Sequence, residues 1–251
     1  MNTKGIILAG GKGTRLHPAT LAMNKHMIPI LNKPMILYPL ETLTKAFGIK
    51  DVMIISGGNH IGSFADLLGD GSEHGASLTY RVQREAGGIA QALLLAEDFV
   101  AGSRCVVVLG DNIFDNTAVF DDAAGIRPEN NACIFTKDVG YAEASRFGVV
   151  RFDEESKVRI SAIVEKPEIP PSPYAVTGLY SYPPDVFEKV RTLSFSSRGE
   201  LEITDLNNLY VGEGRMTNNS VSGFWSDAGT PESLARTTAW ALSDLLAKQG
   251  V

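Results

Sequence analysis

Short apolar runs alternate with amphipathic segments through the first half of the chain. The runs at 5–10, 51–56, 78–83 and 105–111 are rich in Ile, Val and Leu, so they are predicted as strands. The run over 106–109 has no polar alternation, which is typical of strands buried on both faces. Helical segments are expected at 35–48, 61–71 and 88–100. This alternation predicts βαβ units, and hence an α/β fold with a mostly parallel sheet flanked by helices.

The second half of the chain has a different, β-rich pattern. A hairpin is predicted over 147–167, a surface loop over 167–173 and a strand over 174–182. Helices are expected near 184–191, 201–211 and 231–248. No flexible linker separates the halves, so we expect a single domain over 1–251, with an α/β half (1–115) and a β-rich half (116–251).

Composition excludes several classes of protein. The chain has 251 residues, of which 44% are hydrophobic, and this is enough for a sizeable core and too apolar for a disordered protein. A pI of about 5.3 argues against electrostatic binding to nucleic acid or to anionic membranes. No apolar run approaches the ~20 residues of a membrane helix. Cys105 and Cys133 suggest neither a disulfide framework nor a zinc site, which favours the cytoplasm.

A glycine-rich loop, LAGGKGTRL, directly follows the first predicted strand. Its glycines let backbone N–H groups approach a phosphate or a base closely, and Thr14 and Arg15 add a hydroxyl and a guanidinium. The spacing fits neither a P-loop nor a dinucleotide fingerprint, because Leu16 stands at the third glycine position. Taken alone, the loop could be a plain turn with a surface arginine. Lys25 could add a second cation, although a lone lysine is more often only solvated.

Two aspartates and one glutamine are further candidates. Asp111 ends an apolar strand and Asp227 lies in WSDAGT; both could bind Mg²⁺, which prefers hard oxygen ligands, if the fold brings them together. A turn or helix-cap role is the equal alternative for each aspartate on spacing alone. Gln83 ends a strand, and its amide offers the donor and acceptor that the imide edge of thymine or uracil requires. Gly88 follows at a predicted helix start.

Several motifs occur in one order along most of the chain. GIILAGGKGTRL, NKHMIPI and KPM are followed by VLGDNIF, RFGVV, VEKP, YAVTGLY, RGELEITDLN and FWSDAGTPESL. Together they resemble the signature of the sugar-1-phosphate nucleotidylyltransferases, and the later motifs are most similar to the glucose-1-phosphate thymidylyltransferase branch. The resemblance extends from Lys4 to about residue 240. The short stretch after Asp227 leaves room for one helix, so we expect a short form of the catalytic core.

The resemblance implies a Rossmann-like fold of the nucleotide-diphospho-sugar transferase type and a Mg²⁺-dependent transfer from dTTP to glucose 1-phosphate. Residues 1–115 would mainly bind nucleotide, and residues 116–251 would mainly bind sugar phosphate. The implied catalytic residues are Arg15, Lys25 and Asp111, and the metal ligands are Asp111 and Asp227. The implied nucleotide-binding set is Leu8, Gly10, Gly11, Gly13, Thr14, Arg15, Lys25, Gln83, Gly88 and Asp111. The implied sugar-phosphate set is Asn112, Gly148, Glu165, Lys166, Val176 and Arg198.

Three positions depart from the family pattern and leave the sugar open. Phe147 stands where many members have tyrosine, Val164 replaces a common acidic residue, and Lys12 interrupts a loop of small residues. UTP in place of dTTP, or another sugar 1-phosphate, remains an alternative, because one methyl group is worth only ~1–3 kcal/mol. A non-catalytic nucleotide-sugar-binding regulatory paralogue is a second alternative, and the missing third glycine disfavours a dinucleotide-dependent oxidoreductase. The expected partners are the two substrates and a possible second copy of the chain, with no nucleic acid or membrane.

Overall fold

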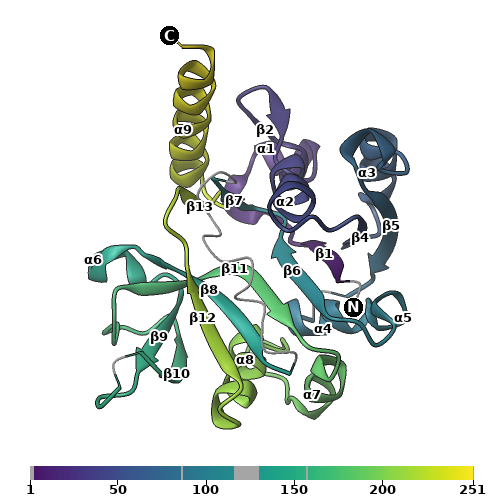
Figure 1. Cartoon of the computed structure of the whole chain (residues 1–251). Coiled ribbons are helices and arrows are strands. Elements are labelled where there is room, and N and C mark those ends of the chain that lie inside the picture. The colour runs from purple at the N-terminus through teal and green to yellow at the C-terminus, as the bar shows by residue number, and fades with distance from the viewer. Residues whose placement is uncertain (1–2, 86, 116–129, 157, 251) are drawn as a thin grey trace.

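Four parallel strands form the first half of the central sheet. The computed structural model describes residues 3–85, 87–115, 130–156 and 158–250. The strands are β1 (Lys4–Ala9), β4 (Asp51–Gly57), β5 (Ser77–Gln83) and β6 (Cys105–Leu109), arranged in the order β6-β1-β4-β5 (Figure 1). Ile6 faces Met53 on one side and Val107 on the other. The predicted parallel sheet is thus confirmed, and its ligand-binding edge lies at the carboxyl ends of these strands.

Successive side chains of the sheet belong to opposite core layers. Ile7 packs with α2 (Leu37–Glu41) and α3 (Ile61–Leu68), whereas Ile6 packs with α4 (Ile89–Leu94) and α5 (Glu97–Val100). α2 continues into a π-helical turn, Thr42–Ala46. The expected single helix over 88–100 is wrong, because Leu95 and Ala96 end α4 and begin α5 without any Gly or Pro to signal the break.

The second half continues the same sheet with antiparallel pairing. β11 (Tyr174–Tyr182) pairs with β6, with β8 (Ala132–Asp138) and with β9 (Gly148–Phe152). β9 forms the predicted hairpin with β10 (Ile160–Glu165), and β12 (Met216–Ser220) is added parallel to β8. β12 was not predicted, because its sequence MTNNS has a single apolar residue.

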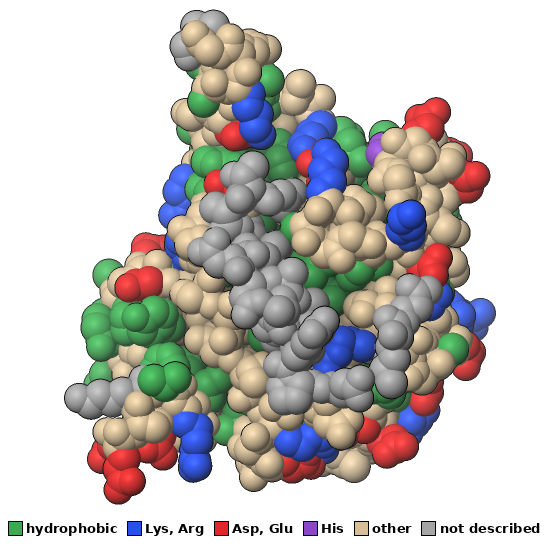
Figure 2. Space-filling model, viewed as in Figure 1, with side chains coloured by type: hydrophobic (Ala, Val, Ile, Leu, Met, Phe, Trp, Pro, Cys, Tyr) green, Lys and Arg blue, Asp and Glu red, His purple; other side chains and the backbone are tan. Residues whose placement is uncertain are grey.

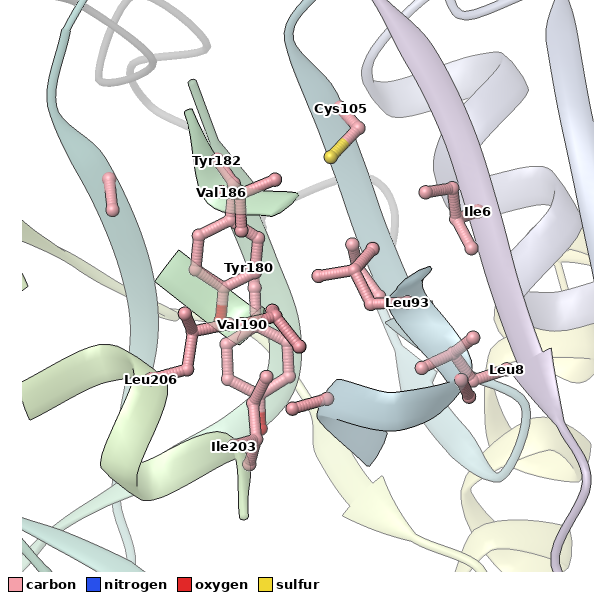
Figure 3. Packing of buried hydrophobic residues seen from close by; sticks show 14 of the residues in the cluster. Ile6, Leu8, Leu93, Cys105, Tyr180, Tyr182, Val186, Val190, Ile203 and Leu206 are labelled. Carbon is pink, nitrogen blue, oxygen red and sulfur yellow. The ribbon is translucent and has the colours of Figure 1, made fainter. Parts of the chain in front are cut away.

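Helices of the second half share one core with α4. α6 (Gly140–Ala144) follows β8, while α7 (Val186–Thr192) and α8 (Ile203–Gly212) pack on the face that α4 covers. Figure 3 shows Leu93 of α4 between Ile6 of β1 and the Tyr180, Val190 and Leu206 group. The hydrophobic core therefore runs without interruption from the first half into the second.

Two small sheets and the last helix complete the described structure. β7 (Asn112–Phe114) pairs with β13 (Trp225–Asp227), and β2 (Pro29–Ile30) pairs with β3 (Lys33–Pro34). Short turns of helix span Thr14–Leu16, Ala19–Ala22, Lys25–Met27 and Ser72–His74. α9 (Pro231–Gln249) begins at a capping box formed by Thr230 and Ser233. Its Ala241 packs in one core with Ile30 of β2, and its C-terminal end projects at the top of Figures 1 and 2.

The charge on the surface and the character of the helices can be compared with what is expected of nucleic-acid-binding and membrane proteins. Lys and Arg side chains are interspersed with Asp and Glu on the face shown in Figure 2. Within the described ranges, no helix has both the length and the apolar character needed to cross a bilayer.

Candidate active site

Asp111 and Lys25 form a tight ion pair at the carboxyl end of β6. Lys25 Nζ lies 2.5 Å from Asp111 Oδ2, and their side chains are only 11% and 12% exposed. Burial opposes ionisation of Asp111, but the charges of Lys25 and His26 and the hydrogen bonds from Lys25 and Asn112 outweigh it and lower the pKa of Asp111 well below its usual value. The carboxylate is therefore held in its charged form.

Asp227 lies beside Asp111 because β7 and β13 pair. Asp227 is opposite Asn112 in this ladder, and the Ala228 N–H donates to the Asp111 backbone oxygen at 2.8 Å. A Cβ placed on Gly229 would lie 2.9 Å from Asp227 Oδ1 and 3.5 Å from Asp111 Oδ2. Both carboxylates therefore face one small space. The fold thus brings Asp111 and Asp227 together, which is the condition for their binding one metal ion.

Arg15 reaches the same space from the glycine-rich loop. Its Nη2 lies 2.9 Å from the Cβ position of Gly229, and among the described residues it forms no ion pair with a carboxylate. Gly13 has φ 66°, a left-handed conformation that suits glycine, and it begins the turn that carries Arg15. Thr14 lies in that turn and is exposed. The site thus brings two cations and two carboxylates together.

A cavity of about 250 Å³ opens on one side of Asp111. It is lined by Leu8, Gly10, Gly11, Lys25, His26, Gln83, Gly88, Ile89, Ala92, Leu109, Asp111 and Glu200. Seven of the residues expected to bind nucleotide are in this lining, whereas Gly13, Thr14 and Arg15 are not. The lining residues that were not expected from the sequence are His26, Ile89, Ala92, Leu109 and Glu200; Glu200 belongs to the RGELEITDLN motif, in which only Arg198 was expected.

Gly88 has a structural reason to be glycine. Its φ is 97°, and a Cβ there would lie 2.5 Å from the Leu201 backbone oxygen. The Leu201 N–H also donates to the Gly87 oxygen at 2.8 Å. The start of α4 is therefore fastened to the second half of the chain, next to the cavity.

A second cavity, of about 180 Å³, lies on the other side. It shares Ile89 and Leu109 with the first cavity, and Arg15 and Asp227 also line it. Asn112, Gly148, Glu165, Lys166 and Val176, all expected from the sequence, are among its lining residues. Residues that the sequence analysis missed are Arg146, Thr177, Gly178, Tyr180, Ile203, Thr204, Asn207 and Trp225; Phe147 had been noted only as a departure.

Glu165 and Lys166 are oriented by their neighbours at the end of β10. Glu165 Oε2 accepts from Thr204 Oγ1 at 2.7 Å, and Lys166 Nζ lies 3.3 Å from Glu165 Oε1. Lys166 has φ 42°, a conformation that side chains rarely adopt, and its N–H donates to the Phe147 oxygen at 3.0 Å. Such strain often accompanies functional positions.

Arg198 does not line either cavity. It instead pairs with Glu202, at 2.8 Å between Nη2 and Oε2, on an exposed loop before α8. The phosphate contact expected of Arg198 therefore requires this ion pair to open.

Asn112 connects three strands at the floor of the site. Its Oδ1 accepts from Trp225 Nε1 and from the Gly178 N–H, each at 2.8 Å, and its Nδ2 donates to Asp111 Oδ1 at 3.1 Å. With both lone pairs of its oxygen occupied, Asn112 acts here mainly to orient Asp111.

The cysteines lie away from this chemistry. Both are buried free thiols, and burial raises the pKa of Cys105 to about 12 and that of Cys133 to about 11. Thiolates are the reactive form of cysteine, so neither residue is suited to nucleophilic catalysis.

Two adjoining cavities with paired cations and carboxylates at their junction are suited to an enzyme that joins two phosphate-bearing molecules. The chain belongs to the nucleotidyl transferase family, whose model matches residues 4–243. A glucose-1-phosphate thymidylyltransferase of Neisseria meningitidis is 45% identical over 236 residues, covering 92% of this chain and 80% of the relative. A protein of the same name from Xanthomonas campestris is 46% identical, covering 92% and 78%.

Solved structures agree with this assignment. A Bacillus anthracis protein assigned as a glucose-1-phosphate thymidylyltransferase, in complex with sucrose, superposes with a TM-score of 0.85 at 47% identity and covers 95% of each chain. A UDP-glucose pyrophosphorylase bound to UDP-glucose has a TM-score of 0.86 at 24% identity, covering 97% of this chain and all of the other, which shows the shared fold.

Proposed function

We propose that the protein transfers a thymidylyl group from dTTP to glucose 1-phosphate and releases dTDP-glucose and pyrophosphate. The observation that carries the proposal is the meeting of Arg15, Lys25, Asp111 and Asp227 between the two cavities. An oxygen of the sugar phosphate forms a bond to the α-phosphorus while the bond to the bridging oxygen of pyrophosphate breaks. Catalysis then rests on positioning and charge neutralisation, which this arrangement supplies.

The first cavity is proposed to hold dTTP. Gln83 would hydrogen bond to the thymine edge, and Leu8, Gly10, Gly11 and Gly88 would contact the base and sugar. Gly13 and Thr14 would place backbone N–H and hydroxyl donors near the phosphates, where Arg15 and Lys25 would neutralise the charge that develops on pyrophosphate. Glu200 is an additional wall of this cavity.

The second cavity is proposed to hold glucose 1-phosphate. Glu165 would accept hydrogen bonds from sugar hydroxyls, since Thr204 and Lys166 already hold its carboxylate in place. Lys166 would meet the sugar phosphate, and Arg198 would join it after leaving Glu202. Asn112, Gly148 and Val176 would shape the pocket. In this proposal, residues 1–115 mainly bind nucleotide and residues 116–251 mainly bind sugar phosphate.

Mg²⁺ is the proposed cofactor, held by Asp111 and Asp227. The donor set fits, because both carboxylates face one space and Mg²⁺ is usually bound by one or two carboxylates with substrate phosphates. When bound, the ion would neutralise charge on the phosphates. Lys25 occupies Asp111 Oδ2 at present, so this lysine would shift toward the nucleotide. The buried free thiols suit a reducing compartment, so a cytoplasmic enzyme is proposed.

A substrate grid tests the proposed function. Pyrophosphate release is measured with each of dTTP, UTP, CTP and ATP against several sugar 1-phosphates in the presence of Mg²⁺. The expected optimum is dTTP with glucose 1-phosphate, with measurable activity toward UTP, because the two nucleotides differ in one methyl group on the base. A protein that binds dTDP-glucose but releases no pyrophosphate with any pair would instead be the regulatory paralogue.

Replacement of Asp111 tests the metal assignment. Asp111→Asn is expected to abolish pyrophosphate release and also to lower the melting temperature, because the amide keeps the size of the carboxylate but leaves Lys25 without an anionic partner; a thermal melt shows that the variant is folded at the assay temperature. Asp98→Asn, at an exposed position on α5, is the matched control and should retain full activity. Near-normal turnover of Asp111→Asn would refute the assignment.

A further inference from the structure

The amide of Gln83 is hydrogen bonded through its nitrogen, and its oxygen lies against the glycine-rich loop. Gln83 Nε2 donates to Gln91 Oε1 of α4 at 2.8 Å. On the other side, Gln83 Oε1 lies only 2.6 Å from the point that a Cβ on Gly10 would occupy. The nitrogen therefore faces α4 and the oxygen faces the glycine-rich loop, on the wall of the first cavity.

We propose that Gln91 is a specificity-determining positioning residue, which fixes the orientation of the Gln83 amide and so selects thymine or uracil over cytosine. The inference rests on the proposed function, in which Gln83 contacts the base. Gln91 itself does not line the cavity and acts only through Gln83.

The chemistry of the two kinds of base explains why orientation matters. Thymine and uracil present an N3–H donor beside carbonyl acceptors, whereas cytosine presents an N3 acceptor beside an amino donor. An unrestrained glutamine amide can turn by 180° and match either edge, because its oxygen only accepts and its nitrogen only donates. With one Gln83 N–H committed to Gln91 Oε1, the other N–H and the Gln83 oxygen suit the imide edge, and turning the Gln83 amide requires the Gln91 amide to turn with it.

Substitution of Gly87 offers a second way to perturb the hydrogen bond between Gln83 and Gln91. A Cβ at Gly87 would lie 2.7 Å from Gln91 Cδ and 2.9 Å from Gln91 Nε2. The glycine makes room for the Gln91 amide, and Gly87→Ala should displace that amide without touching Gln83.

The test compares kcat/KM for dTTP and CTP in variants at Gln91. Gln91→Met removes the acceptor at similar size, and the dTTP-to-CTP ratio is expected to fall about 3- to 10-fold, the worth of one neutral hydrogen bond. The KM for dTTP should rise, while the KM for glucose 1-phosphate should stay within twofold. Gln91→Glu keeps an acceptor and should retain most of the ratio. Gly87→Ala should resemble Gln91→Met, and Gln249→Met, exposed at the end of α9, should resemble the wild type.

Two outcomes separate this inference from the proposed function. If Gln83→Ala erodes nucleotide preference but Gln91→Met and Gly87→Ala leave the dTTP-to-CTP ratio unchanged, the role of Gln91 is refuted and the role of Gln83 stands. If Gln83→Ala itself leaves the preference unchanged, base reading by Gln83 is refuted. An equal loss with all nucleotides in both Gln91→Met and Gly87→Ala would show a merely structural role and would also overturn the inference.

Discussion

At the scale of single residues, Gly229 lies among three charged groups of the site, those of Arg15, Asp111 and Asp227. Arg15 Nη2 and Asp227 Oδ1 each lie 2.9 Å from its Cβ position, closer than real Cβ contacts allow. Its backbone N–H also donates to Asp227 Oδ1 at 2.7 Å. A side chain here would therefore push apart the groups that the proposed reaction needs together.

Gly229→Ala is expected to lower kcat by at least about 10-fold, since small misplacements of a reacting group can cost 10²-fold in rate. The measurement is steady-state pyrophosphate release, accompanied by a thermal melt. Gly62→Ala on α3 is the control, because a Cβ there meets nothing within 4 Å and alanine favours a helix. Equal activity of the two variants would contradict the crowding described above.

His26 links pH to stability. Burial, together with the charge of Lys25, lowers the pKa of His26 from 6.5 to about 3. Between these values the unfolded chain binds a proton that the folded protein does not, so the free energy of unfolding falls as the pH falls. This residue alone should contribute a loss of up to about 1.4 kcal/mol per pH unit below 6.5.

Urea denaturation between pH 6.5 and 5 measures this loss, and the slope should be smaller in His26→Phe. NMR of the imidazole gives a direct check: His26 should remain neutral at pH 5. An imidazole signal from His26 that titrates with a midpoint near 6.5 would show that the ring is not isolated from solvent as the structure indicates.

At the scale of elements, the three-residue strands β7 and β13 depend on one side chain. Asn112→Ala would leave Trp225 Nε1 and the Gly178 N–H without their acceptor in a buried environment. Each unsatisfied group costs ~1–3 kcal/mol, so the free energy of unfolding should fall by about 2–6 kcal/mol. Chemical denaturation followed by fluorescence measures the loss.

Asn59→Ala serves as the comparison, since Asn59 is exposed after β4 and its replacement should change stability by less than about 0.5 kcal/mol. A similarly small effect for Asn112→Ala would mean that water or a rearranged β13 satisfies the exposed donors.

Elements with strong apolar patterns could be predicted from the sequence, and those made by pairing could not. The runs that became β1, β4, β6 and β11 have the composition of buried strands, and their predictions are confirmed. β7 and β13 are three residues long, and β12 is nearly all polar, so their existence depends on tertiary partners. The candidate site follows the same rule.

The sequence motifs identified candidate residues of the site, but they did not predict the contacts that these residues make. The sequence could suggest Asp111 and Asp227 separately, but their approach depends on the β7–β13 ladder. The resemblance implies a phosphate contact for Arg198, and the local ion pair with Glu202 cannot be read from a motif. The bond between Gln83 and Gln91 joins a strand to a helix and has no signature in either segment.

At the scale of the whole molecule, β6 and β11 join the two halves. Val106, Val107 and Val108 are fully buried, and β11 covers the edge of the strand that contains them. A fragment of residues 1–115 would expose this apolar edge and lose the part of the core formed by α7 and α8. Unpaired apolar edges promote association between chains.

The fragment 1–115 is therefore expected to aggregate or to lack a cooperative thermal transition, whereas the full chain should unfold cooperatively. Size-exclusion chromatography and near-UV circular dichroism of both proteins measure this difference. A monomeric fragment with a sharp transition would show that the first half is an independent folding unit.

The two cations of the site differ in exposure and in pairing, which implies that they bind a polyphosphate one after the other. Lys25 is engaged by Asp111 before any substrate arrives, whereas Arg15 is exposed on the glycine-rich loop. An incoming polyphosphate would meet Arg15 first, so the salt dependence of the association rate should belong to Arg15. Lys25 can bind the polyphosphate only after it leaves the carboxylate of Asp111. First binding of the polyphosphate, by Arg15, and its later engagement by Lys25 would thus be separate events.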